Sequence, residues 1–192
     1  LRQRDALSVD MVRYLENLAA NDSHPDGLLA GSLLFCLLSR ARVGDLRRGA
    51  IEPFVDASAG SSVSFVQTEL GSYKTARPGT KKRMPVVAPH PGVTEASWPR
   101  VWLDRRAREG LDSSLGFGLF AAPLVAGGFS TLQLKTSEVG QELRRILAAG
   151  GFDEEGISNN GAHSLEATCL AWAAKRGLSP ETRRFLGYHR LP

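Results

Sequence analysis

Hydrophobic residues recur three apart over 12–18, just after Ser8 and Asp10, and this spacing predicts a helix that either residue would cap. The turn-forming residues at 21–27 predict a loop. The apolar run that follows predicts a second helix over 28–42. Because this second helix has almost no polar face, we expect it to lie at the centre of the core.

Over 51–88 the pattern changes from helical spacing to alternation. Short alternating runs such as 63–67 predict strands. A basic loop that contains Lys74 separates two of them, and the return strand starts near Arg83. Pro85 lacks an amide hydrogen, so we expect this strand at the edge of an antiparallel sheet.

The second half of the chain returns to helical periodicity. Residues 98–110 and 136–149 each predict a helix with one apolar face. The glycine-rich segment 112–130 predicts a long loop, and the polar segment 153–161 predicts another. The side chains expected to face inward are Trp98, Val101, Trp102, Ala107, Val139, Leu143, Ile146 and Leu147.

The segment 161–190 predicts two helices joined by a tight turn. His163 opens the first helix, Gly177 ends it, and Ser179 with Pro180 begins the second. This outline suits a DNA-reading helix–turn–helix, but shape alone favours an ordinary packed helical pair. With the preceding elements it predicts one mostly helical α+β domain over residues 1–192, with a small antiparallel sheet.

Composition adds limits to this prediction. The chain is 42% hydrophobic and 23% charged with a net charge of +4, which is typical of a folded domain and permits a polyanionic partner such as DNA. The apolar run at 28–38 is too short to cross a bilayer, so we expect no membrane association. Cys36 and Cys169 lie in apolar helical runs without neighbouring metal ligands, which favours a reduced, intracellular protein with no metal site.

The candidate chemistry lies in four short segments. Taken singly, each has a simpler explanation: a local ion pair, a solvated hairpin lysine, or a histidine bonded to backbone. Their order along the chain makes them informative as a set. The segments are the arginine box with Arg42 and Asp45, the hairpin residue Lys74, the pair His163 and Glu166, and the ending Leu186-Gly187-Tyr188-His189.

In this order and spacing, the four segments resemble the catalytic domain of tyrosine recombinases, also called phage-type integrases. The arginine box, the hairpin lysine, the His-x-x-Arg box and the Leu-Gly-His box each have a counterpart here. The resemblance covers nearly the whole chain. It is greatest to recombinase-like open reading frames of eukaryotic mobile elements.

The resemblance implies DNA integration and recombination by strand breakage and rejoining through a 3′-phosphotyrosyl intermediate, without metal or cofactor. Arg42 would clamp the phosphate with support from Asp45, Lys74 would protonate the leaving 5′-oxygen, and His163 and His189 would donate hydrogen bonds to the phosphate. The implied partners are double-stranded DNA and further copies of the chain in a synaptic tetramer. The implied location is intracellular and DNA-associated, which in a eukaryote is the nucleus.

Three features depart from the family pattern. Glu166 stands where the family has its second arginine, and Tyr188 is inserted between Gly187 and His189 or itself takes the histidine position. The nucleophilic tyrosine would follow His189, so we expect a chain truncated before the nucleophile, without the N-terminal core-binding domain. The tyrosines of the chain are Tyr14, Tyr73 and Tyr188.

These departures predict a degenerate or inactive recombinase site. Two other functions stay open at this point. One is a non-catalytic DNA-binding module, and the other is a helical protein-interaction domain without a nucleic-acid role.

Overall fold

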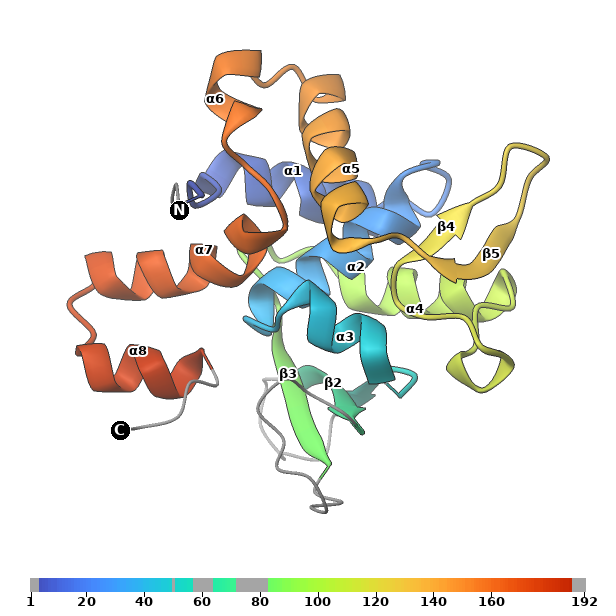
Figure 1. The fold of residues 1–192 in the computed structure, drawn as a ribbon, viewed down its shortest axis with the longest axis horizontal. Coiled ribbons are helices and arrows are strands. Elements are labelled where there is room, and N and C mark those ends of the chain that lie inside the picture. Colours follow the sequence, from blue (N-terminus) through green and yellow to red (C-terminus); the bar gives the residue numbers. More distant parts are fainter. Residues whose placement is uncertain (1–3, 50, 57–63, 72–82, 188–192) are drawn as a thin grey trace.

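The computed structural model describes residues 4–49, 51–56, 64–71 and 83–187. Helices surround one central helix, a three-stranded sheet lies below them, and a two-stranded hairpin projects to one side (Figure 1). This arrangement confirms the predicted α+β class. The elements are α1 (Val9–Ala20), α2 (Gly27–Leu38), α3 (Val43–Gly49), β1 (Phe54–Asp56), β2 (Ser64–Leu70), β3 (Met84–His90), α4 (Trp98–Arg108), the 3-10 turn η1 (Ser113–Leu115), β4 (Ala121–Pro123), β5 (Phe129–Gln133), α5 (Thr136–Ala149), α6 (Glu154–Ser158), α7 (Ala162–Lys175) and α8 (Pro180–Leu186).

The helix α2 forms the centre of the core, as predicted. All of its residues except Leu29 are buried, and it packs against α1, α4 and α7. It ends at Leu38, four residues earlier than the apolar run suggested, because the chain turns there. Within the described ranges, none of the helices combines the length and the apolar character needed to cross a bilayer.

The contact between α2 and α4 depends on one glycine and one indole ring. Trp102 stacks on Phe35 with ring centroids 5.9 Å apart, and its indole nitrogen donates to the Leu28 carbonyl at 3.1 Å. A Cβ atom at Gly31 would lie 2.2 Å from the Trp102 ring. Only glycine therefore lets these two helices approach so closely.

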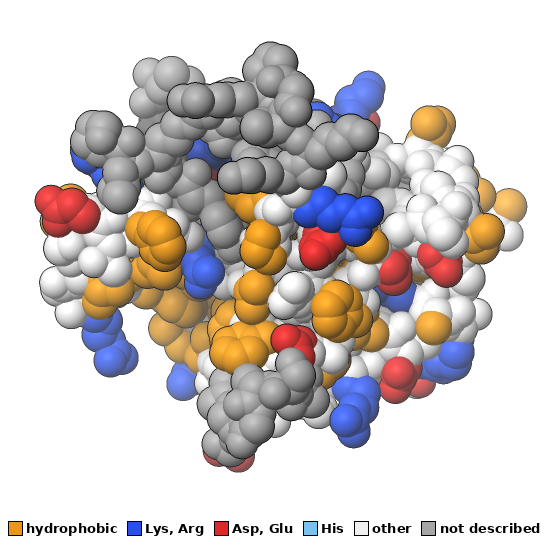
Figure 2. Space-filling model, turned by 90° about the horizontal axis from the view of Figure 1, so that it is seen from below, with side chains coloured by type: hydrophobic (Ala, Val, Ile, Leu, Met, Phe, Trp, Pro, Cys, Tyr) orange, Lys and Arg blue, Asp and Glu red, His pale blue; other side chains and the backbone are white. Residues whose placement is uncertain are grey.

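The three-stranded sheet has the order β1-β2-β3 and is antiparallel throughout, as the sequence predicted. Val66 lies opposite Ala88, and Thr68 opposite Val86. These four side chains are buried on the face toward the helices. On the other face Phe65, Gln67 and Val87 are half-buried, and Figure 2 shows hydrophobic side chains exposed on this side of the molecule.

Two predicted loops are in fact regular structure. The segment 112–130 contains η1, β4 and the start of β5, which form a turn and an antiparallel hairpin. The hairpin turn uses Gly127 and Gly128, both at positive φ. The segment 153–161 contains the short helix α6, capped by the Asp153 side chain.

The inward face of α4 also differs from the prediction. Ala107 is exposed, whereas its neighbour Arg106 is 2% exposed. A buried guanidinium is stable here because Arg106 binds both carboxylate oxygens of Glu52, at 2.7 and 2.9 Å, and lies over the Trp102 ring. An apolar periodicity cannot reveal a partner that lies 54 residues away in sequence.

We predict that Gly31→Ala lowers the stability of the fold. The added methyl group would overlap the Trp102 ring, which is fixed by its stacking on Phe35 and its hydrogen bond to Leu28. Helices α2 and α4 must therefore separate, which costs about 1–3 kcal/mol of folding free energy. Thermal unfolding followed by circular dichroism measures the effect. Gly44→Ala in α3 is the matched control: its Cβ meets nothing nearer than Arg48 at 4.0 Å, and it should be neutral or slightly stabilising. An unchanged melting temperature for Gly31→Ala would contradict this packing.

Candidate functional site

Arg42 is placed by the way in which the chain leaves α2. Arg40 adopts φ 59, in the left-handed region, and the Ala41 amide donates to the Cys36 carbonyl at 3.2 Å. This pattern is a Schellman turn with arginine where glycine is usual. The Arg42 carbonyl then accepts the Asp45 amide at 2.9 Å and begins α3. The buried end of α2 thus fixes the backbone of Arg42.

Glu166 and His163 lie in the first two turns of α7. Ser164 closes the start of this helix, because its hydroxyl accepts the Gly161 amide at 3.0 Å. The same turn packs closely against α5. A Cβ atom added at Gly140 of α5 would lie only 3.2 Å from the Ala162 nitrogen. The sequence prediction that His163 and Glu166 share one helix face is confirmed by a distance of 4.0 Å between His163 Nδ1 and Glu166 Oε2.

The structure joins these two segments by an ion pair. Arg42 Nε donates to Glu166 Oε1 at 3.1 Å, across 124 residues of sequence. The Arg42 side chain is 29% exposed and that of Glu166 is 14% exposed, whereas His163 is 79% exposed. The pair is therefore partly shielded from water, with an exposed imidazole at its edge.

Asp45 lies one turn along α3 from Arg42. Its carboxylate, 9% exposed, accepts a hydrogen bond from Arg48 Nη2 at 2.6 Å. The segment that begins at Arg42 thus contributes to two ion pairs, Arg42 with Glu166 and Asp45 with Arg48.

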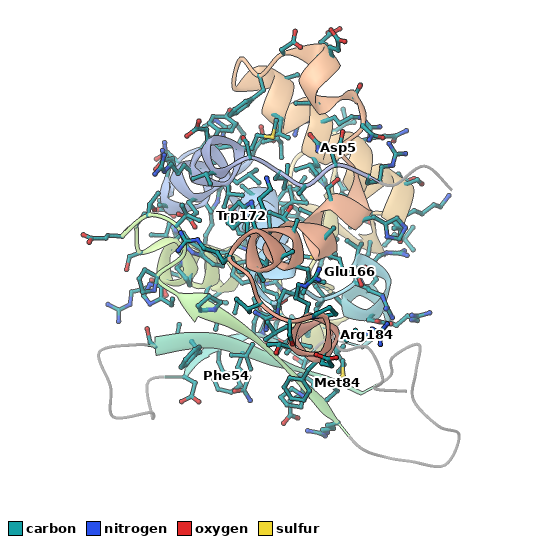
Figure 3. The ribbon with its side chains drawn as sticks, turned by 90° about the vertical axis from the view of Figure 1, so that its left-hand side faces the viewer. Asp5, Phe54, Met84, Glu166, Trp172 and Arg184 are labelled. Carbon is teal, nitrogen blue, oxygen red and sulfur yellow. The ribbon has the colours of Figure 1, made fainter. Side chains whose placement is uncertain are left out.

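The helices α7 and α8 lie one above the other at this end of the molecule; Figure 3 labels Glu166 and Trp172 on the first and Arg184 on the second. Arg40 ties α8 to the end of α2, because its Nε donates to the Leu186 carbonyl at 3.0 Å. Leu186 belongs to the predicted Leu-Gly-His segment, so this bond holds the start of that segment near Arg42. Sequence analysis missed Arg40, whose only signal was its place beside the arginine box.

The structure brings together some of the predicted site residues. Arg42, His163 and Glu166 lie together, and Asp45 follows Arg42 on α3 but pairs with Arg48. Lys74, Tyr188 and His189 lie outside the described residues. Among the residues that are described, no three His, Cys, Asp or Glu side chains group as a metal site would require.

The two cysteines lie near this region but carry none of its chemistry. Burial raises the pKa of the Cys36 thiol far above its ordinary value, and the Glu166 charge adds to this shift. Burial likewise raises the pKa of Cys169 to about 11, although the nearby Arg40 lowers it slightly. Both thiols therefore stay protonated and unreactive at neutral pH, as expected of small core residues.

Comparison with known proteins gives a fold but no family. No protein-family model matches the sequence, and no curated protein matches it. The structure is similar to that of a lambda integrase (75–356) dimer bound to a COC′ core site, with a TM-score of 0.57 and 19% sequence identity. The match covers 100% of this chain and 59% of the integrase chain. At this level of identity the likeness shows that the chain has the fold of the matched part of the integrase fragment.

Proposed function

We propose that this chain is a tyrosine-recombinase-like domain that binds the backbone of duplex DNA and does not cleave it. The observation that carries the proposal is the ion pair between Arg42 and Glu166, at the place where a recombinase-type site would hold a phosphate. The likeness to a DNA-bound integrase supports the DNA partner. The proposed location follows from that partner: the protein would be found with DNA, in the nucleus if its host is a eukaryote.

The proposed chemistry requires free cations. A phosphodiester under attack gains negative charge on its non-bridging oxygens, and hydrogen-bond donors fixed in advance around those oxygens lower the barrier. Arg42 is suited to this task because its guanidinium is always charged and its backbone is fixed by α2. In the proposed site His163 and His189 are further donors, and Lys74 is the acid for the leaving oxygen.

Glu166 opposes this chemistry in two ways. It occupies Arg42 Nε, which would otherwise point a hydrogen bond at the phosphate. It also brings a negative charge where a second arginine would lie, and like charges about 4 Å apart repel by roughly 4 kcal/mol at an effective dielectric constant of 20. The transition state for cleavage has more negative charge than the bound DNA, so Glu166 disfavours cleavage more than it disfavours binding.

DNA contact on this face therefore survives, in weakened form, while strand cleavage does not. Other arginines of the same stretch of chain, Arg40 at the end of α2 and Arg48 on α3, add positive charge for backbone contacts that need no chemistry. We accordingly favour the non-catalytic DNA-binding module over an active recombinase. A role as a tetramer subunit on DNA is not required by this proposal.

We predict that Arg42 and Glu166 stabilise each other in the folded state. In a double-mutant cycle with Arg42→Met and Glu166→Gln, the coupling should be roughly 1–2 kcal/mol, because both side chains are partly shielded from water. Urea unfolding gives the four free energies. The control cycle uses the exposed pair Arg83 and Glu69, for which the coupling should stay below about 1 kcal/mol. Equal coupling in the two cycles would count against a special role for the pair.

We predict salt-sensitive binding to duplex DNA that improves when Glu166 loses its charge. Fluorescence anisotropy with a labelled duplex, at several salt concentrations, should show affinity that falls as salt rises. Glu166→Gln should raise the affinity about fivefold, since relief of one repulsion near the backbone is worth about 1 kcal/mol at the water-exposed edge. Glu166→Arg should raise it further.

The control for DNA binding is Glu69→Gln, which removes a carboxylate that is also paired with an arginine, on β2. It should leave affinity within about twofold of the wild type. Affinity that does not depend on salt, or an equal effect of both variants, would remove the basis of the DNA proposal and favour a protein-interaction domain. A covalent adduct between the wild-type chain and a nicked suicide substrate would show instead that the site is active.

A further inference from the structure

The hairpin β4–β5 is an unusually apolar part of the surface. Between Asp112 and Lys135 the sequence has no charged residue, although 23% of the chain is charged. Of the nine large hydrophobic side chains exposed in the described part of the chain, four lie in this segment. They are Leu115 (66% exposed), Leu124 (50%), Val125 (110%) and Leu132 (78%).

The hairpin projects from the body of the protein at the side opposite α7 and α8 (Figure 1). Leu124 and Val125 lie in its turn, which is closed by a hydrogen bond from the Leu124 amide to the Gly128 carbonyl at 3.0 Å. Figure 2 shows hydrophobic side chains exposed at the same side of the molecule. An apolar tip that extends into solvent costs free energy unless a partner covers it.

The strands of this hairpin also leave open edges. The sheet has two strands only, so within the described residues each strand pairs on one side. Proteins usually protect such edges with charged residues or proline. The strand β4 ends in Pro123, but β5 has neither a proline nor a charge. The edge of β5 is therefore open to another extended, uncharged strand.

A small pocket lies at the base of the same hairpin. Its volume is about 70 Å³, which is room for the branched end of an aliphatic side chain. Its lining includes four charged side chains, two of each sign: Asp26, Glu142, Arg106 and Arg145. Arg145 pairs with Asp26 at 2.5 Å and with Glu142 at 2.7 Å. The apolar part of the lining comes from Leu28, Leu29, Leu119, Ala121, Pro123 and Phe129.

From this surface we infer that two copies of the chain associate through their β4–β5 hairpins, about a two-fold axis. An antiparallel arrangement of the hairpins sets the tip of each copy, Leu124 and Val125, at the base pocket of the other. Such a contact is self-complementary and closes as a dimer. It covers the exposed apolar tip and the open edge of β5 in one step.

The fit of the tip to the pocket of the same chain favours a second copy as the occupant, and charge allows it at this surface. Each chain has a net charge of +4, so two copies repel each other overall and approach at least electrostatic cost through uncharged segments. The two hairpins are such segments. This inference does not depend on DNA binding, because the hairpin tip lies on the side opposite α7, which carries Glu166 (Figure 1).

Sedimentation equilibrium of the whole chain, over a range of concentrations, tests the proposal. The wild type should show a reversible monomer–dimer equilibrium, and Val125→Asp should raise the dimer dissociation constant by roughly tenfold or more, since it buries a charge at the contact. The matched control is Phe185→Asp, a change at a side chain of α8 that is 72% exposed. It should leave the dissociation constant unchanged.

A second substitution tests the pocket itself. The charged residues of the pocket lining are two carboxylates and two guanidiniums, so a charge of either sign at position 125 is disfavoured there, and Val125→Lys should weaken the dimer about as much as Val125→Asp does. Circular dichroism checks that each variant keeps the fold, which is expected because Val125 is fully exposed. A wild type that is monomeric at all concentrations, an effect of Phe185→Asp equal to that of Val125→Asp, or a dimer that Val125→Lys leaves unchanged would each overturn the proposal.

Discussion

The buried helix α2 determines where the candidate chemistry of this protein lies. Its residues are closed off from water on nearly every side, so it cannot shift without opening voids in the core. The chain leaves the helix through Arg40 in a left-handed conformation that costs about 1 kcal/mol for a residue other than glycine. The hydrogen bond from Arg40 to Leu186 helps to offset that cost and ties α8 to the same point. Arg42 therefore starts from a fixed position.

The same fixed position explains why Glu166 matters. A guanidinium in a position to bind a phosphate can also bind a carboxylate, because both anions present oxygen atoms that accept its hydrogen bonds in similar geometry. Here the carboxylate comes from α7 of the chain itself, at 3.1 Å. Under the proposed function, an internal anion thus occupies one donor of a phosphate site. Binding of a DNA backbone and cleavage of it become separable properties in such a site.

Much of this structure could be predicted from the sequence, for identifiable reasons. Helices α1 and α5 have strong apolar periodicity and α2 is a nearly continuous apolar run, and Ser8 and Ser179 cap helices where the sequence predicted. The hairpin β4–β5 was missed because its strands are short and are flanked by glycines such as Gly127 and Gly128, so the segment looks like a loop. The burial of Arg106 was missed because its partner Glu52 is remote in sequence.

The candidate site was predictable to a similar extent. The order of Arg42, His163 and Glu166 along the chain indicated one region through the resemblance, but it did not decide which cation Glu166 would pair with. The role of Arg40 was not predictable, because it depends on a backbone conformation that the sequence does not encode locally.

The central claim is that Glu166 holds Arg42 Nε in the folded protein. The NMR signal of the Arg42 Nε–Hε group tests it directly, once assigned by its loss in Arg42→Lys. The account predicts slow exchange of this proton with water, slower than that of Arg83, whose side chain is 66% exposed, and a large shift of the signal in Glu166→Gln. A signal that exchanges as fast as that of Arg83 and does not move in Glu166→Gln would contradict it.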